Sequence, residues 1–97
     1  MLVKWNITAT RQLLDALDFI EEAGYPDYAD ELEKEIISKT RKLSQDPELY
    51  AIDRFRKNNK GNYRAFTVDS YRISYRVGKN EVSIVRIRHT SRRVKQY

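Results

Sequence analysis

The sequence has 97 residues, of which 34% are charged and 40% hydrophobic, with one histidine and no cysteine. This length predicts a single domain, small enough to bury only about 60–65% of its unfolded surface. The composition excludes disulfides and thiolate metal sites, and no apolar run approaches the roughly 20 residues that cross a membrane.

Charge is divided unevenly along the chain. Residues 1–50 contain 6 Lys/Arg and 11 Asp/Glu, whereas residues 51–97 contain 13 Lys/Arg and 3 Asp/Glu. This asymmetry predicts one face suited to a polyanion or an acidic partner, and its alternative is a generic basic surface. The start lacks the apolar run of a signal peptide, and the absence of cysteine fits a reducing compartment, so we expect a cytoplasmic protein.

The first 50 residues predict a strand followed by a helical hairpin. Residues 2–8 alternate in the period of a half-buried strand, and Thr8 or Thr10 can then cap a helix. Gly24 is suited to end this helix in a left-handed conformation, and Pro26 to begin the next. Each helix has an apolar stripe at three- and four-residue spacing: Leu13, Leu17 and Ile20, then Ala29, Leu32, Ile36, Thr40 and Leu43.

The second half predicts an irregular segment and three strands. Asp46-Pro47 stops the second helix, and residues 45–62 are polar and rich in turn formers. Strands are expected at 63–68, 71–77 and 82–88, joined by short turns. The order β-α-α-β-β-β predicts an α+β fold, with a helical hairpin packed on one face of a largely antiparallel four-stranded sheet.

Alternation assigns faces to the strand residues. Tyr71, Ile73, Tyr75 and Val77 should face the helices, which places Arg72 and Arg76 on the open face. In the strand at 82–88, alternation places Ser83, Val85 and Ile87 in the core, and Arg86 and Arg88 on the open face with Val82 and Ile84. In the strand at 63–68, Arg64 is expected on the open face, with Phe66 nearby. A shift of one residue would reverse any of these assignments.

This constellation is sufficient for metal-free RNA cleavage. Clustered arginines bind phosphates, and an aromatic ring stacks on an unpaired base. Histidine, here only His89, can take a proton from a ribose hydroxyl, and a tyrosine such as Tyr97 can protonate a leaving oxygen. One histidine without cysteine gives no transition-metal ligand set, so we expect no metal and no cofactor. The same residues also have a structural interpretation: a hydrogen-bonded histidine, solvating arginines and a frayed end.

The chain resembles the RelE/ParE toxin superfamily of bacterial type II toxin–antitoxin systems over essentially its whole length. The resemblance lies in the element order, in the strand YRISYRV at 71–77, and in the segment RIRHTSRR at 86–93 followed by Tyr97. In the RelE-like branch, ribosome-dependent endoribonucleases cut mRNA and inhibit translation. The resemblance then implies four catalytic residues: Arg64, Arg72, His89 and Tyr97. It implies substrate binding by Arg76, Arg86, Arg88, Arg92 and Arg93.

Two alternatives remain open. The ParE-like branch shares the fold and poisons DNA gyrase without ribonuclease chemistry, and a degenerate toxin would only bind its antitoxin. The chain lacks a second histidine, which the ribonucleases often have. In every case the resemblance implies a small cognate antitoxin, which would bind by strand addition to a free sheet edge or as a helix near Leu14 and Ile20. The other expected partner is ribosome-bound mRNA or, in the alternative, gyrase.

Overall fold

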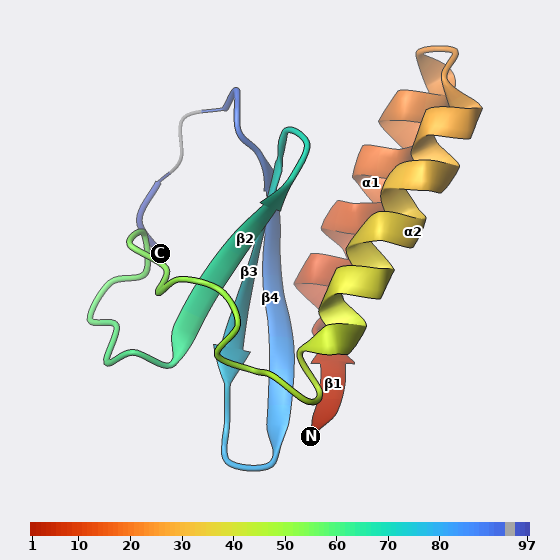
Figure 1. Ribbon diagram of the computed structural model, residues 1–97. Helices are drawn as coiled ribbons and strands as arrows, with labels where there is room; N and C mark the ends of the chain where they lie inside the picture. Colours follow the sequence, from red (N-terminus) through yellow and green to blue (C-terminus); the bar gives the residue numbers. More distant parts are fainter. Residues whose placement is uncertain (93–94) are drawn as a thin grey trace.

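The computed structural model describes residues 1–92 and 95–97. The elements are β1 (Leu2–Trp5), α1 (Ile7–Glu22), α2 (Pro26–Lys42), β2 (Tyr63–Val68), β3 (Tyr71–Val77) and β4 (Glu81–His89). The α+β fold and the order β-α-α-β-β-β are confirmed, and the two helices cover one face of the sheet (Figure 1). Within the described ranges, no helix is both long and apolar enough to cross a membrane.

The sheet is mixed, with strand order β1-β4-β3-β2. β2, β3 and β4 form an antiparallel meander, and β1 adds beside β4 in the parallel direction. β1 ends opposite Ile84, so within the described residues no strand pairs with the outer edge of β4 from Val85 onward. There the side chain of Gln12 replaces a strand, because its Oε1 accepts the Ile87 amide at 2.8 Å.

The start of α1 differs from the sequence prediction. The helix is capped by Asn6, whose Oδ1 accepts the Ala9 amide at 2.7 Å, rather than by Thr8 or Thr10. Asn6 also donates its own amide to the Ile84 carbonyl, so the cap is fixed by the end of the β1–β4 pairing. The predicted end of α1 is confirmed, since Gly24 has φ +97° directly after the C-cap.

The core lies between the helices and the sheet. Its largest fully buried side chains are Tyr75, Leu32, Ile36, Leu43, Ile73, Ile84, Val68 and Val82. Both helical stripes predicted from the sequence are buried in it. α1 packs mainly over β4, while α2 lies over β2.

A β-bulge corrects the predicted faces of β4. Ser74 pairs with Arg86 but Tyr75 pairs with Ile84, so Val85 is an extra residue in the ladder. Val82, Ile84 and Ile87 all enter the core as a result, whereas the alternation predicted Val82 and Ile84 on the open face and Ser83 and Val85 in the core. A strict period of two cannot accommodate an inserted residue, and this is why the prediction failed here.

Candidate functional site

The sheet face opposite the helices carries the predicted arginines of β3 and β4. The register pairs Arg72 with Arg88 and Arg76 with Ser83, and Arg86 pairs with Ser74 between them. Direct cross-strand neighbours share a face, and the residues that alternate with these on β3 are in the core. The predicted placement of Arg72, Arg76, Arg86 and Arg88 on one face is therefore confirmed.

The loop that precedes β2 and residues 95–97 of the C-terminal tail, which is the segment after β4, cover part of this face. The Asp53 amide donates to the Tyr63 carbonyl at 2.8 Å, which holds residues 51–53 beside β2. The tail then pairs with the same loop, because the Tyr97 amide donates to Phe55 at 2.9 Å and the Lys57 amide donates to Tyr97 at 2.7 Å. In Figure 1 the C-terminal end of the chain lies to the left of the strands, beside the loop that precedes β2.

Asp53 is the centre of this arrangement, although only 1% of it is exposed. Its Oδ1 accepts the Arg72 guanidinium at 2.9 Å and the Phe55 amide at 3.0 Å, and its Oδ2 accepts the Tyr97 hydroxyl at 2.6 Å. Burial opposes ionisation of Asp53, but these three hydrogen bonds outweigh it and hold the pKa of the carboxyl below its usual value. We call Asp53, Arg72 and Tyr97 the latch, because they tie the loop, the sheet and the tail together.

Arg86 lies beneath the tail, with 7% of it exposed. Its guanidinium stacks on the Tyr97 ring, 4.0 Å from the centroid, and its Nη1 donates to the Lys95 carbonyl at 3.2 Å. Within the described residues, its Nε and Nη2 have no hydrogen-bond partner. Burial lowers the pKa of Arg86, because removal from water disfavours the charged guanidinium.

Tyr97 is held on several sides. Its hydroxyl donates to Asp53, Arg86 stacks on the ring, and Arg56 lies over both Tyr97 and Tyr63, at 5.1 and 4.0 Å from their centroids. Burial, together with the hydrogen bond to Asp53, raises the pKa of Tyr97 to about 12. Tyr97 is thus an ordered part of the site and not a frayed end.

Arg64 is on the other face, which corrects the prediction. It pairs with Tyr75, and Phe66 pairs with Ile73, so both residues share the helix-facing side of the sheet. The Arg64 guanidinium donates to the Tyr50 carbonyl at 2.7 Å, with a longer contact to Glu48 at 3.4 Å. It therefore holds the loop that follows α2. The sequence assignment failed because the parity of β2 could not be read without its register.

His89 is also separated from the latch. It pairs with Tyr71, a core residue, and the two rings meet edge to face at 5.0 Å. Its Nδ1 accepts the Ser91 amide at 3.0 Å, so the neutral ring carries its proton on Nε2. His89 lines a groove of about 550 Å³ between α1 and the uncovered edge of β4, which also includes Asp15, Phe19 and Arg92. Of the two predicted tail arginines, Arg92 lines this groove and Arg93 lies outside the described residues.

Sequence reasoning missed two residues that organise this region. Asp53 was overlooked although it is the only acidic residue in 51–68, a stretch that contains five Lys/Arg. Asn59 donates to the Asp53 and Tyr63 carbonyls, and its Oδ1 accepts the Gly61 and Tyr63 amides. A lone carboxylate among cations is the signal that could have identified Asp53. Over the described part of the chain, no three His, Cys, Asp or Glu side chains are grouped as metal ligands.

Comparison with known proteins identifies the family. Residues 3–94 match the model described as the ParE toxin of the type II toxin–antitoxin system parDE. The fold is similar to a solved structure titled "Chromosomal ParDE TA system from P. aeruginosa", with a TM-score of 0.72, 23% identity, and coverage of 92% of this chain and 95% of that one. No curated protein sequence matches the chain. The match to the family model extends over nearly all residues, and the chain therefore belongs to the ParE family of type II toxin–antitoxin toxins.

Proposed function

We propose that this protein is a non-catalytic poison of DNA gyrase, which is one of the two alternatives to the ribonuclease that its sequence leaves open. The observation that carries the proposal is that the four residues predicted to cleave RNA do not converge. Arg72 and Tyr97 are both bound to Asp53. Arg64 faces the helix side and binds loop carbonyls, and His89 packs edge to face against Tyr71, on that same side.

This arrangement is unfavourable for acid–base chemistry. A general base and a general acid must both reach the groups around one phosphate, whereas His89 and Tyr97 belong to opposite faces of the sheet. The Tyr97 hydroxyl is donated to Asp53, and its pKa of about 12 makes it a poor proton donor. The charge of Arg72 is already balanced by the Asp53 carboxylate, so little of it remains for a transition state.

The membership in the ParE family supports the same conclusion. One observation favours a ribonuclease instead: part of the Arg86 guanidinium on the open face has no hydrogen-bond partner among the described residues. The experiments below therefore distinguish a gyrase poison from a ribonuclease.

A reconstituted gyrase assay tests the proposal. We expect the purified protein, added to gyrase and supercoiled plasmid, to trap double-strand breaks that appear after the gyrase is denatured and digested. His89→Gln should behave as the wild type in this assay, because a poison needs no proton transfer. Cut mRNA with intact plasmid after expression in cells would instead support the ribonuclease. Harmless expression without either lesion would support a degenerate toxin.

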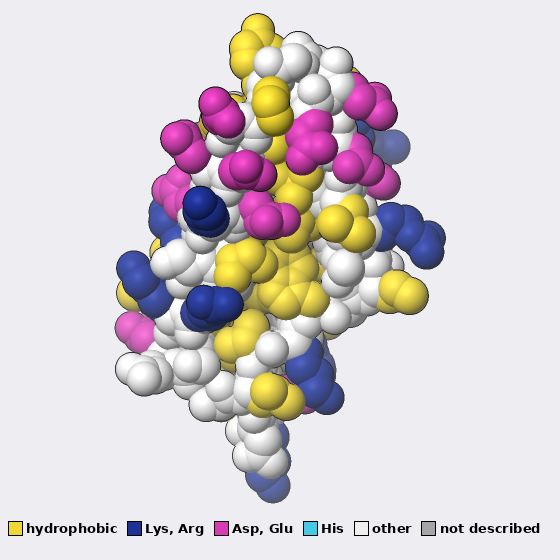
Figure 2. Space-filling model, turned by 90° about the vertical axis from the view of Figure 1, so that its right-hand side faces the viewer, with side chains coloured by type: hydrophobic (Ala, Val, Ile, Leu, Met, Phe, Trp, Pro, Cys, Tyr) yellow, Lys and Arg dark blue, Asp and Glu magenta, His cyan; other side chains and the backbone are white. Residues whose placement is uncertain are grey.

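We also propose that a cognate antitoxin occupies the groove between α1 and β4. Phe19 is 72% exposed at this groove, and no strand in the described part of the chain pairs with the adjacent β4 edge from Val85 onward. Figure 2 shows apolar side chains exposed among the acidic residues of the helical side. A partner that combines an extended segment with an apolar side chain would cover both features.

Co-expression with the adjacent small reading frame tests this partner. The antitoxin should co-purify with the toxin and restore growth. Phe19→Glu should abolish co-purification, while Ile7→Glu, an equally exposed apolar position at the start of α1, should leave it intact. Equal loss in both variants would argue against the groove, and no co-purification of the wild type would argue against the pairing itself.

A further inference from the structure

The basic half of the chain keeps most of its charge unneutralised. Its three acidic side chains are already engaged: Asp53 with Arg72, Asp69 with Tyr28, and Glu81 with Lys4. Among the described basic residues of 51–97, only Arg72 forms a carboxylate ion pair. The positive charge is therefore not compensated within the fold and is available to a ligand.

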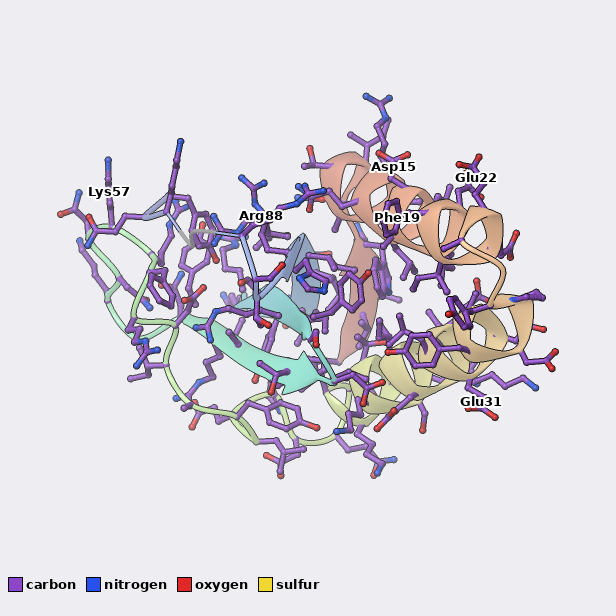
Figure 3. The ribbon with its side chains drawn as sticks, turned by 90° about the horizontal axis from the view of Figure 1, so that it is seen from above. Asp15, Phe19, Glu22, Glu31, Lys57 and Arg88 are labelled. Carbon is purple, nitrogen blue, oxygen red and sulfur yellow. The ribbon has the colours of Figure 1, made fainter. Side chains whose placement is uncertain are left out.

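Six arginines are gathered on the sheet face opposite the helices and on the loop that covers it. We call this surface the basic face: Arg54, Arg56, Arg72, Arg76, Arg86 and Arg88. Figure 3 shows that Lys57 of the same loop lies at one end of the molecule, and that Asp15, Glu22 and Glu31 of the helices lie at the other. The molecule is thus strongly polarised, which would orient it toward a polyanion.

The aromatic rings of this face are already occupied. Phe55 is stacked by Arg54 and Arg72 at 5.0 and 4.9 Å, and Arg56 and Arg86 stack on the Tyr63 and Tyr97 rings as described above. A ring face that a guanidinium covers is not free to stack on an unpaired base, which is how single-stranded nucleic acid is usually bound. The stacks instead hold the guanidinium groups, a type of group that binds phosphate oxygens through its N–H donors.

We propose that the basic face binds the phosphate backbone of duplex DNA, without reading its sequence. This contact goes beyond the proposed poisoning of gyrase, because the toxin would make it without the enzyme. Arg76 and Arg88 supply cations on neighbouring strands, and Arg54 and Arg56 of the covering loop add two more. Arg86 is buried beneath the tail and contributes its positive charge to the face rather than an accessible N–H donor. Duplex is favoured over single strands because charge is abundant on this face while free aromatic surface is scarce.

Fluorescence anisotropy of a labelled 20-base-pair duplex measures the binding directly, with the 97-residue protein and no gyrase. We expect the logarithm of the association constant to fall linearly with the logarithm of the salt concentration, with a slope of about −4 if four of the six arginines contact phosphates. The double variant Arg76→Gln/Arg88→Gln should reduce the slope to about −2 and raise Kd at 100 mM salt about tenfold.

A matched control and a matched ligand complete the test. Lys34→Gln removes one positive charge from the exposed surface of α2 and should leave Kd within about twofold. If Lys34→Gln weakens DNA binding as much as Arg76→Gln or Arg88→Gln alone, the effect depends only on net charge. That result would overturn the proposed role of the basic face. Tighter binding to a single-stranded oligonucleotide of equal charge would overturn the duplex assignment, as would no binding of the duplex at 50 mM salt. Gyrase poisoning that persists in the double variant would separate this inference from the proposed function.

Discussion

Replacing Asp53 by asparagine should destabilise the protein more than any other change of a single charge. Asparagine keeps the size of the side chain, but it leaves the largely buried Arg72 guanidinium without a carboxylate. Removing one partner of a buried ion pair costs about 3–5 kcal/mol, and the retained amide oxygen places the expected loss near the lower value, about 3 kcal/mol. For a domain of this size that loss corresponds to a Tm lower by about 12–24 °C.

Urea denaturation of the two proteins measures this loss, and Asp69→Asn is the control. Asp69 is exposed and accepts a single hydrogen bond from Tyr28, so its replacement should cost less than about 1 kcal/mol. A loss below about 1 kcal/mol for Asp53→Asn, or equal losses for both variants, would refute the role of the latch. Combining Asp53→Asn with Tyr97→Phe should give less than the sum of the two effects, because both remove the same hydrogen bond.

The pH dependence of stability follows from the same carboxyl. Its folded-state pKa lies below the ordinary value of 3.8, so folding favours the ionised form. The contribution of Asp53 is fully present above the unfolded pKa and is lost as pH falls through the folded one. The difference in stability between wild type and Asp53→Asn should therefore be constant near neutral pH and shrink below about pH 4. A difference that stays unchanged to pH 2 would contradict this.

Three further predictions concern side chains at defined positions. Tyr97 should ionise near pH 12, so Tyr97→Phe should remove a late step from the absorbance titration of tyrosinate, and a step near pH 10 would contradict its burial. Gln12→Leu should cost about 1–3 kcal/mol in urea denaturation, because the Ile87 amide loses its acceptor in a partly buried place; an unchanged midpoint would show that solvent replaces it. Asn59→Ala should speed hydrogen exchange of the Tyr63 amide and leave the exchange rates of the helix amides unchanged. An equal change at Tyr63 and in the helices would mean that this side chain does not hold the loop.

The element order and most of the core could be predicted, because local periodicity determines both. The YRISYRV strand alternates without interruption, so Ile73 and Tyr75 were assigned correctly to the core. The faces of β4 could not be derived, since the bulge at Val85 depends on pairing with β3 rather than on the strand's own composition.

The candidate site was predictable only in part. The shared face of the strand arginines follows from alternation, but Asp53 and Tyr97 are 44 residues apart and no local pattern links them. Arg64 was grouped with the others by an assumed strand parity, His89 by the proton chemistry of histidine, and both also by family resemblance. Only the three-dimensional register shows that they point to the opposite side of the sheet.

The parallel pairing of β1 with β4 has a consequence for synthesis. Leu2 pairs with Glu81, so the first strand made has no neighbour until the last strand follows it. At about 5–20 residues per second, this separation corresponds to a delay of roughly 4–16 s. During that time the apolar stripe of α1 lacks the strand over which it packs. The nascent chain therefore exposes this stripe until β4 is made, and the complete fold, with any activity that needs it, forms only afterwards.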